Sequence, residues 1–429
     1  MDVAGVFTLT RIEPTPAYGM GSGKAKEIAD KAKELFADCI IFDWEIDPTK
    51  QRNWEKLCSI PVFDRNEVIL RIFASRAQTK EAVLQVELAR LTYSLPRLSH
   101  MYGDLARQRG GSYGAKGSGE TQLELDRRQT EDKIVQIKKE LEQVSQNRQT
   151  QRKQRERNSV HSCALVGYTN AGKSSLLNAL TGSEVFVENK LFATLDPTTR
   201  KYSLGEGSSV LLTDTVGFIS NLPHTLVNAF RSTLEEASFA DLLLITVDSS
   251  DLECIKQYKQ VLKVLQEIGA EKIPRLVLLN KWDMTEKGLS WSTGEDSSVE
   301  GEDSANEGNF ASEKESGAFA EGADACERIA ELNAAFPDAI KLSAKTQEGF
   351  VELQQKITEN LFGSSRNYVI PASRADLVEL ARKNGTIQSE EWLEDAVHLK
   401  ARIPGFIDEN GKASTRTLSL LKPYQKDLL

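Results

Sequence analysis

The sequence predicts an α/β protein of several domains, built around a doubly wound sheet. Three observations predict this class. The 429 residues are too many for one compact core. Between residues 158 and 363, five apolar runs are each followed by a polar loop and a helical segment, as in a parallel sheet with helices on both faces. Strand-like and helical runs also alternate at the start of the chain, and again after residue 366.

Residues 1–97 are expected to form a small N-terminal α/β subdomain. Its strands are predicted at "CIIFDWEI" and "IPVFDR", two short apolar runs. Segments with helical spacing, such as "GKAKEIADKAKELF" and "KEAVLQVELARLTYSL", precede and follow them. This alternation predicts a parallel sheet with a cover of helices.

Residues 98–157 are expected to form a helical hairpin with a glycine-rich tip. The glycine-rich run "RQRGGSYGAKGSGETQ" at 107–122 leads directly into a long polar helix. One narrow stripe of that helix is apolar, which predicts antiparallel packing against the preceding helix. The stripe consists of Leu123, Leu125, Ile134, Ile137, Leu141 and Val144. The tip is longer than the two to five residues that a simple helical hairpin needs, so it is expected to have another role.

Residues 158–365 are expected to form the doubly wound domain, and residues 366–429 a small α+β C-terminal domain. Residues 286–327 interrupt the former with 12 acidic and 2 basic side chains. Such a segment has too little apolar surface to fold, and it is interpreted as a disordered acidic insertion. After residue 366 the patterns predict one strand, one helix and two further strands.

Composition favours a cytoplasmic protein. Hydrophobic residues make up 40% and charged residues 27% of the chain, and no apolar run is long enough to span a bilayer. The N-terminal residues do not resemble a secretory signal. The five cysteines are scattered without C-x-x-C spacing, so neither disulfides nor zinc are expected. A monomer is expected.

The net charge of -9 comes from the insertion. Residues 105–157, in contrast, hold 13 basic and 8 acidic side chains. The acidity of the whole chain therefore does not argue against a nucleic-acid partner for the hairpin.

The run "GYTNAGKS" at 167–174 follows the first apolar run of the central domain and opens a helix. It matches G-x-x-x-x-G-K-S in the strand–loop–helix context that this phosphate-binding loop requires. Gly167 and Gly172 leave room for backbone N–H groups around the phosphates, at the positive end of a helix. Lys173 is expected to reach the β- and γ-phosphates, and the Ser174 hydroxyl to bind Mg²⁺. The central domain is therefore predicted to have a P-loop fold.

The tetrapeptide "NKWD" at 280–283 indicates which base is bound. The Asp283 carboxylate can accept two hydrogen bonds from guanine, and adenine lacks this pair of donors. Asn280 and Lys281 are expected to brace the loop. "SAK" at 343–345 ends the last apolar run and is expected to bring backbone N–H groups near guanine O6. The motifs together predict a P-loop GTPase domain.

The pentapeptide "DTVGF" at 214–218 is expected to sense the γ-phosphate. Asp214 can hold a water of the Mg²⁺ ion, and the Gly217 N–H can bind the γ-phosphate until hydrolysis breaks the contact. In Ras-like enzymes a glutamine after this glycine orients the attacking water. Phe218 cannot do so. The catalytic residue is therefore unknown, and slow turnover without a partner is expected.

Two further positions near the phosphates have open roles. The stretch "LFATLDPTTR" at 191–200 offers Thr194, Thr198 and Thr199 to close over Mg²⁺, and spacing alone does not choose between them. The Asn170 oxygen could bind K⁺, which would add positive charge where other GTPases use an arginine finger. The alternative is that Asn170 only caps local backbone.

These segments together resemble the HflX family of ribosome-associated GTPases over nearly the whole chain. The resemblance is carried by "GSGK" at 21–24, "LQVELA" at 84–89, "GSGETQLELDRR" at 117–128, "GYTNAGKSSLLNALTG", "LFATLDPTTR", "DTVGFISNLPH" and "NKWD". The glycine-rich tip joined to "FATLDPT" and "DTVGF" is specific for this family. The long acidic insertion departs from its pattern.

The resemblance implies a GTP-hydrolysing switch that binds the large ribosomal subunit, with the tip reaching toward the peptidyl transferase centre. The GTP-bound protein is expected to split stalled or stressed ribosomes, and hydrolysis to release it. Thr194 is then the implied switch threonine and Mg²⁺ ligand beside Ser174. The family also implies ATP as a partner of the N-terminal domain.

The expected GTP-binding residues are Gly167, Tyr168, Thr169, Asn170, Ala171, Gly172, Lys173, Ser174, Ser175, Phe192, Ala193, Thr194, Leu195, Asp196, Asp214, Thr215, Val216, Gly217, Asn280, Lys281, Asp283, Ser343, Ala344 and Lys345. The expected ribosome-contacting residues are Gly110, Gly111, Lys116, Gly117, Gly119, Arg127 and Arg128.

Two alternatives remain. One is a GTPase of RNA assembly or modification, although no modification domain is recognisable. The other is a signalling switch that binds protein effectors and no RNA. Salt dependence separates them, because binding driven by RNA phosphates weakens steeply as salt is added.

Overall fold

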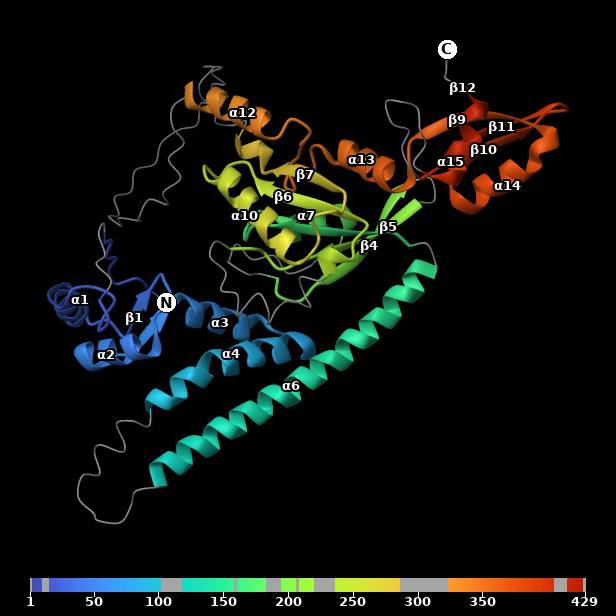
Figure 1. Cartoon of the computed structure of the whole chain (residues 1–429). Coiled ribbons are helices and arrows are strands. Elements are labelled where there is room, and N and C mark those ends of the chain that lie inside the picture. The colour runs from blue at the N-terminus through green and yellow to red at the C-terminus, as the bar shows by residue number, and fades with distance from the viewer. Residues whose placement is uncertain are drawn as a thin grey trace, which may run out of the picture. The chain divides into compact units, whose positions relative to one another are not determined.

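The computed structural model (Figure 1) describes residues 2–9, 15–101, 118–157, 160–182, 194–205, 208–219, 236–285, 323–404 and 415–426. Of these, the residues up to Gln154 form one compact unit and those from Arg155 onward form a second. The first unit joins the N-terminal subdomain to the hairpin, and the second joins the P-loop domain to the C-terminal domain. The finer boundaries at residues 97, 157 and 365 stay predictions.

The first unit begins with a small α/β layer. Its elements are α1 (Ser22–Glu34), β1 (Ile40–Phe42), α2 (Pro48–Cys58), β2 (Val62–Asp64), α3 (Arg65–Arg76) and α4 (Lys80–Met101). The two strands pair in parallel, with Ile40 opposite Val62. Trp54 is fully buried in the core, where its ring contacts Phe42 and Tyr18. Parallel strands need a crossover, and α2 provides it, as the alternating pattern predicts.

The long helix α6 (Ser118–Arg157) runs antiparallel to α4 (Figure 1). Two ion pairs join the start of α4 to the second half of α6: Arg148 to Glu81 at 2.7 Å and Lys80 to Glu140 at 3.5 Å. Ile137 of the predicted stripe is buried, whereas Leu125 is 52% exposed. The stripe therefore packs around the middle of the helix, from Ile134 to Val144, and not at Leu125.

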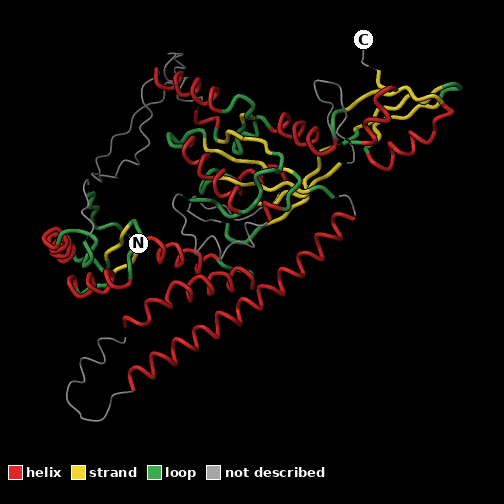
Figure 2. Tube along the Cα trace, viewed as in Figure 1, coloured by secondary structure: helices red, strands yellow, loops and turns green. Residues whose placement is uncertain are grey.

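The second unit contains a six-stranded sheet with the order β4-β5-β3-β6-β7-β8. Its strands are β3 (Ser162–Gly167), β4 (Thr198–Gly205), β5 (Ser208–Asp214), β6 (Leu242–Asp248), β7 (Arg275–Asn280) and β8 (Ile340–Lys341). Its helices are α7 (Lys173–Thr181), α10 (Cys254–Glu267), α12 (Ala323–Ala335) and α13 (Phe350–Phe362). All strands are parallel except β4, which pairs antiparallel with β5. Figure 2 shows helices around this sheet, which confirms the predicted doubly wound P-loop fold.

Two details differ from the sequence prediction. Strand β4 is not among the predicted strands, because only Leu204 of this edge strand is fully buried and no apolar run marks it. The predicted acidic insertion is also too long at its C-terminal end, since residues 323–327 are the first residues of α12. Leu332 of that helix is fully buried, so the helix is held by packing. The rest of the insertion, 286–322, lies outside the described residues.

The C-terminal elements form a four-stranded antiparallel sheet with the order β10-β11-β9-β12. Its strands are β9 (Ser365–Pro371), β10 (Thr386–Trp392), β11 (Ala396–Arg402) and β12 (Gln425–Lys426). Helices α14 (Ala375–Asn384) and α15 (Arg416–Leu421) cover one face around a buried cluster that includes Tyr368, Val378 and Leu418. No described helix is long and apolar enough to cross a membrane.

Candidate nucleotide-binding site

The predicted phosphate loop connects the end of β3 at Gly167 to the start of α7 at Lys173. Gly172 has a φ of 88°, and a Cβ there would lie 2.2 Å from Asn280 Nδ2. Asn280 can approach only because this position carries no side chain, and its Nδ2 donates to the Ala171 carbonyl at 2.8 Å. The phosphate loop and the "NKWD" loop are therefore locked together by one glycine and one amide.

Lys173 is buried beneath the loop. Its ammonium donates to the carbonyls of Gly167 at 3.2 Å and Tyr168 at 2.8 Å. Burial lowers the pKa of Lys173 to about 8, while the charge of Asp214 opposes the shift. A phosphate group bound beside the ammonium would compensate for this desolvation, as the phosphate-loop prediction requires.

Three oxygen-bearing side chains meet next to Lys173. Ser174 Oγ donates to Asp214 Oδ2 at 2.5 Å, and it lies 2.7 Å from Thr194 Oγ1. Asp214 is fully buried, and its Oδ1 has no hydrogen-bond partner in the described part of the chain. Burial raises the pKa of this carboxyl, against the opposing effect of Lys173.

These groups fit Mg²⁺. A hard cation that prefers oxygen ligands could be bound by the two hydroxyls, and a water on it would supply the partner that Asp214 Oδ1 lacks. Of the three candidate threonines, Thr194 contacts Ser174. Thr198 and Thr199 both lie in β4, where the Thr199 hydroxyl pairs with that of Thr213 at 2.9 Å. The geometry therefore favours Thr194, in agreement with the family resemblance.

The segment "DTVGF" lies against the phosphate loop. The Phe218 N–H donates to the Gly167 carbonyl at 3.0 Å, and the Thr169 N–H donates to the Phe218 carbonyl at 2.7 Å. A Cβ on Gly217 would lie 2.8 Å from Thr169 Cα and 3.0 Å from Lys173 Nζ, so only glycine fits there. Phe218 itself is buried. Its ring therefore cannot orient the attacking water, as the sequence indicates.

The guanine loop depends on two residues that the sequence analysis does not select. Asp248 ends β6, and its Oδ2 accepts from Lys281 Nζ at 2.6 Å. Ser249 donates through its Oγ to the Asn280 carbonyl at 2.8 Å. Both directly follow the apolar run "LLLITV" at the carboxyl edge of the parallel sheet, where ligands of such folds bind. That position is the signal that could identify them.

The remaining predicted contacts surround this loop. Asn280 Oδ1 accepts from the Ala344 N–H at 3.0 Å, and Ser343 Oγ accepts from the Lys345 N–H at 3.2 Å. Asp283 is half-buried, and within the described residues its carboxylate accepts no hydrogen bond. It is therefore available to a guanine base, whereas Asn280 and Lys281 are already engaged in holding the loop.

Other predicted residues are placed less directly. Thr215 donates to the Leu165 carbonyl at 2.7 Å, Val216 and Leu195 are buried, and Asp196 and Ser175 are half-buried. Asn170 is exposed and has a φ of 63°, a conformation that asparagine tolerates better than most residues. Backbone geometry thus accounts for asparagine there without a bound cation. Phe192 and Ala193 lie outside the described residues.

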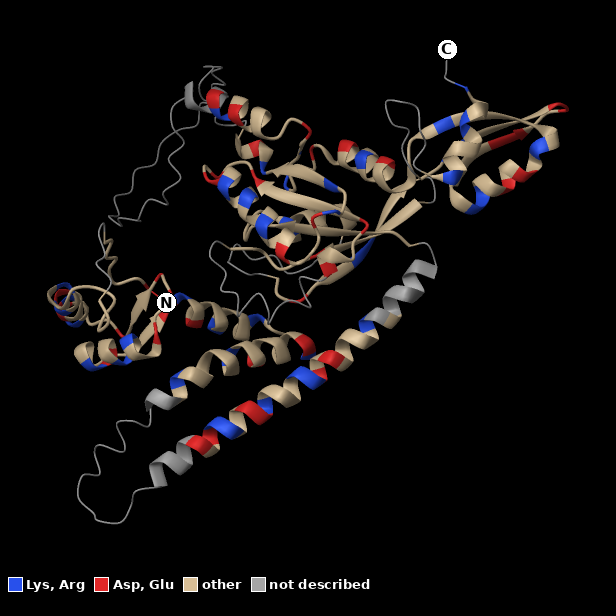
Figure 3. Ribbon diagram, viewed as in Figure 1, with Lys and Arg blue, Asp and Glu red and all other residues tan. Residues whose placement is uncertain are grey.

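The expected ribosome-contacting residues are only partly described. Gly110, Gly111, Lys116 and Gly117 lie outside the described residues, and Gly119 is in the first turn of α6. Arg127 and Arg128 are exposed on the same helix, where Arg127 pairs with Glu131 at 2.9 Å. Figure 3 shows that basic and acidic residues alternate along α6.

Known proteins decide the family. Three family models match consecutive segments: "GTP-binding GTPase N-terminal" at residues 1–74, "GTP-binding GTPase Middle Region" at 76–155 and "50S ribosome-binding GTPase" at 162–281. The GTPase HflX of Akkermansia muciniphila is 44% identical over 412 residues, covering 94% of this chain and 86% of the relative. The chain belongs to the HflX family of GTPases.

Other relatives agree. The HflX GTPase of Escherichia coli K12 is 39% identical over 403 residues, covering 93% of this chain and 85% of its own. Among solved structures, a GTP-binding protein from Sulfolobus solfataricus in complex with GDP is 24% identical with a TM-score of 0.40, covering 81% of this chain and 87% of that one. The family assignment rests on the sequence relatives alone.

As an HflX GTPase, the chain hydrolyses GTP, and its residues divide that task. Lys173 would offer a buried positive charge to bound β- and γ-phosphates, and Gly217 lies so close that a Cβ there would be 3.0 Å from the Lys173 ammonium. Mg²⁺, when bound, would neutralise charge on the same phosphates. Asp283 can read guanine while Asp248 and Ser249 hold its loop. Phe218, the residue after Gly217, has no polar side-chain group that could orient the attacking water.

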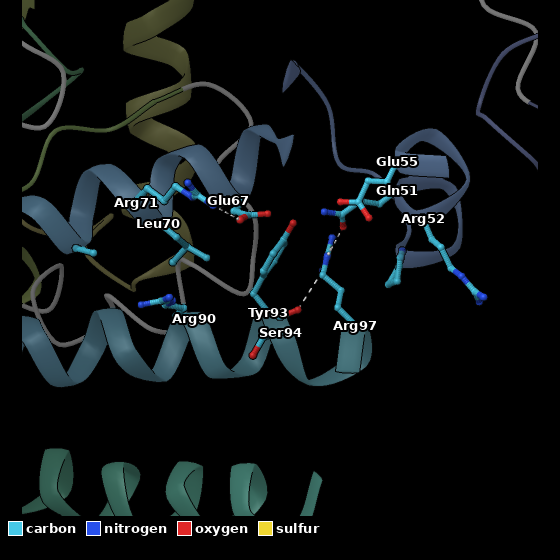
Figure 4. Close-up of a pocket in the computed structure, with 12 residues that line it drawn as sticks. Gln51, Arg52, Glu55, Glu67, Leu70, Arg71, Arg90, Tyr93, Ser94 and Arg97 are labelled. Atoms are coloured by element: carbon cyan, nitrogen blue, oxygen red, sulfur yellow. Dashed lines mark hydrogen bonds and ion pairs between the residues drawn. The ribbon is translucent and has the colours of Figure 1, made fainter. Parts of the chain in front are cut away.

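A separate cavity of about 870 Å³ lies within the first unit (Figure 4). It is bordered by side chains of α2, α3 and α4, including four arginines and two glutamates. Arg71 pairs with Glu67 at 3.0 Å, and Arg97 with Asp64 at 3.3 Å. Arg90 is exposed and has no hydrogen-bond or ion-pair partner among the described residues. The cavity therefore presents one uncommitted guanidinium.

Proposed function

We propose that this HflX GTPase is a switch that binds the large ribosomal subunit and dissociates stalled or stressed ribosomes, with hydrolysis resetting it. The observation that carries the proposal is that Phe218 is buried beside the phosphate loop, where Ras-like enzymes have a glutamine. The residues proposed to bind the nucleotide and Mg²⁺ lie around this position, but Phe218 itself cannot orient the water. A partner is needed to complete the site, and the basic hairpin with its glycine-rich tip is the segment best suited to a particle rich in RNA.

The first experiment is GTP turnover in potassium buffer, with and without purified large ribosomal subunits. We expect slow turnover alone and strong stimulation by the subunit. Equal rates in both conditions would contradict a partner-completed site and favour a signalling switch. Stimulation by naked RNA as strong as that by the subunit would favour the RNA-assembly alternative.

Deletion of residues 111–119 tests the role of the tip. The variant should keep its affinity for GDP and its basal turnover, because the deleted residues belong to the first unit and the nucleotide site to the second. Stimulation by the subunit should disappear. A deletion variant that is stimulated like the parent would refute the sensing role.

Metal dependence is a second part of the proposal. We propose that Ser174, Thr194 and Asp214 serve Mg²⁺, and that Asn170 contributes to a K⁺ site when GTP is bound. Removing Mg²⁺ with a chelator should abolish turnover. Replacing K⁺ with Na⁺ should lower it in the parent protein and leave Asn170→Asp less affected or unaffected; equal rates in K⁺ and Na⁺ would remove the K⁺ site.

We further propose that the cavity of the first unit takes the ATP that the family resemblance implies. Its volume lies in the range of small-molecule sites, and Arg90 is free to bind a phosphate. Calorimetry should detect ATP binding that Arg90→Glu removes. Lys80→Glu makes the same change of charge at the start of α4, away from the cavity, and should keep ATP binding although it loses the ion pair with Glu140. Equal binding by both variants would place ATP elsewhere. We also propose that the protein is a monomer in the cytoplasm.

A further inference from the structure

The C-terminal domain has one face that its own helices leave open. Helices α14 and α15 pack with one face of the sheet, whose inward residues include Tyr368, Ile370, Val397 and Leu399. Alternate residues of the same strands point to the opposite face. Along β11 these are His398, Lys400 and Arg402, of which the first two are exposed.

Strand register aligns cationic residues on this open face. Lys400 is opposite Asn367 of β9, and Asn367 is opposite Lys426 of β12. Directly paired residues of antiparallel strands share a face, so the two lysines flank Asn367 in one row, about 10 Å apart. Arg402 lies two residues along β11, about 7 Å from Lys400. Three basic residues therefore occupy one small area.

The rest of this open face is mostly neutral and polar. Ser365 is paired with Arg402, and Ser389 of β10 with Lys400. Hydroxyl and amide groups of this kind commonly bind phosphate and sugar oxygens. The one acidic residue that the register places here is Glu391, opposite His398 at the far end.

We propose that this open face, defined by Ser365, Asn367, Lys400, Arg402 and Lys426, binds the phosphate backbone of RNA. Charge complementarity carries the choice of partner. A protein partner of comparable stability would need an apolar centre with aromatic anchors. Within the described residues, the apolar side chains that the register places on this face are Val369, Pro371 and Ala396. They follow one another toward the end that carries His398, so they do not form a centre among the basic residues. Among the described strand residues, no phenylalanine, tyrosine or tryptophan lies on this face, and His398 stands at its far end, so binding is expected to be independent of sequence.

The inference takes RNA as partner from the proposed ribosomal function, but it assigns a role to a different domain. Its test also leaves the hairpin unchanged, because both substitutions lie in the C-terminal domain. Lys400→Glu combined with Lys426→Glu should weaken binding of a labelled RNA of about 25 nucleotides by about tenfold or more. The slope of log affinity against log salt should fall by about 1.4, since each lost phosphate contact accounts for about 0.7 with a single strand.

Lys383→Glu is the matched control. Lys383 is exposed on α14, the helix that covers the other face, and the variant makes one Lys→Glu change in the same domain, half the charge change of the double variant. It should leave RNA affinity and salt slope unchanged. GTP turnover without a partner should be equal in all variants, which verifies that they fold.

Three results would overturn the inference. The double variant could bind RNA with an unchanged salt slope. The control could lose as much affinity as the double variant, which would indicate only a general charge effect. Binding of polyglutamate could depend on Lys400 and Lys426 while binding of RNA does not, which would indicate an acidic protein as the partner of this face. Failure of subunit stimulation in the parent protein, by contrast, would break the ribosomal proposal and leave the RNA measurement intact.

Discussion

Two buried aspartates, one in each compact unit, show how differently the same side chain can be used. Asp64 is 2% exposed, and its two oxygens accept from four donors: the backbone N–H groups of Glu67 at 2.9 Å and Ile46 at 3.4 Å, Tyr93 Oη at 2.8 Å and Arg97 Nη2 at 3.3 Å. Asp214 is 0% exposed, yet its Oδ1 has no partner among the described residues.

The difference separates a structural carboxylate from a ligand-binding one. A buried charge with all its hydrogen bonds made joins β2, α3 and α4 and needs nothing further. A buried charge with an unpaired oxygen is costly unless a cation or its bound water completes it. Burial alone does not distinguish the two; the count of partners does.

The largest effect is expected from a substitution beside Asp214, in the nucleotide site. Lys173→Ala removes the buried cation beside Asp214, and GTP turnover should fall by at least about 100-fold. Lys201→Ala, an exposed lysine on β4, is the control and should behave like the parent. Unchanged turnover in Lys173→Ala would withdraw the phosphate-loop assignment.

The matched pair Asp64→Asn and Asp214→Asn tests the comparison directly. Asp64→Asn leaves Arg97 without its charged partner and should destabilise the first unit by about 3–5 kcal/mol. Urea unfolding followed by the fluorescence of the buried Trp54 measures this loss, and GDP affinity should not change.

Asp214→Asn should do the opposite. It removes a buried, incompletely paired charge, so the metal-free protein should be as stable as the parent or more so, while Mg²⁺ should no longer tighten nucleotide binding. If both variants were destabilised alike and both kept the Mg²⁺ effect, the distinction between the two aspartates would be lost.

The protonation of Lys173 should make GDP affinity depend on pH. With a pKa of about 8, Lys173 loses its proton in the free protein as pH rises above 8, whereas bound phosphate retains it. GDP affinity should therefore fall by about tenfold per pH unit above pH 8. In the nucleotide-free protein the sign is reversed. The unfolded chain binds more protons than the folded one between pH 8 and 10.5, so this lysine adds stability as pH rises through that window.

Fluorescent GDP titrations at pH 7, 8 and 9 measure the change in affinity. Lys173→Arg is the control, because a guanidinium stays charged over this range. A parent affinity that is level from pH 7 to 9 would contradict the assigned pKa.

The smallest expected effect concerns the guanine loop. Asp248→Asn weakens the hold on Lys281, and GDP affinity should fall by about 3- to 10-fold, the range of one ordinary hydrogen bond. The Mg²⁺ dependence should remain, because Asp248 is not among the groups around Ser174. Glu253→Gln, an exposed change on the loop after β6, should have no effect. A loss of Mg²⁺ dependence in Asp248→Asn would show that the two parts of the site are coupled.

The class of the fold could be predicted from the sequence alone, and the motifs also predicted a guanine-nucleotide site with a defined chemistry. Phosphate loops and guanine loops need particular residues at fixed spacing, since backbone N–H groups and a carboxylate must meet one rigid ligand. Motifs such as "GYTNAGKS" and "NKWD" are therefore readable without coordinates. The alternation of apolar runs and helices is likewise local, and it predicted the doubly wound sheet.

Which side chains meet could not be predicted from the sequence and became clear from the three-dimensional arrangement. Contacts between segments that are distant in sequence give Asp248 and Ser249 their roles. Such contacts also bring Thr194 to Ser174 and leave one oxygen of Asp214 unpaired. Strand β4 escaped prediction because an edge strand buries little and carries a weak pattern. The open face of the C-terminal sheet depends on strand register, which sets the row of Lys400, Asn367 and Lys426 across three strands.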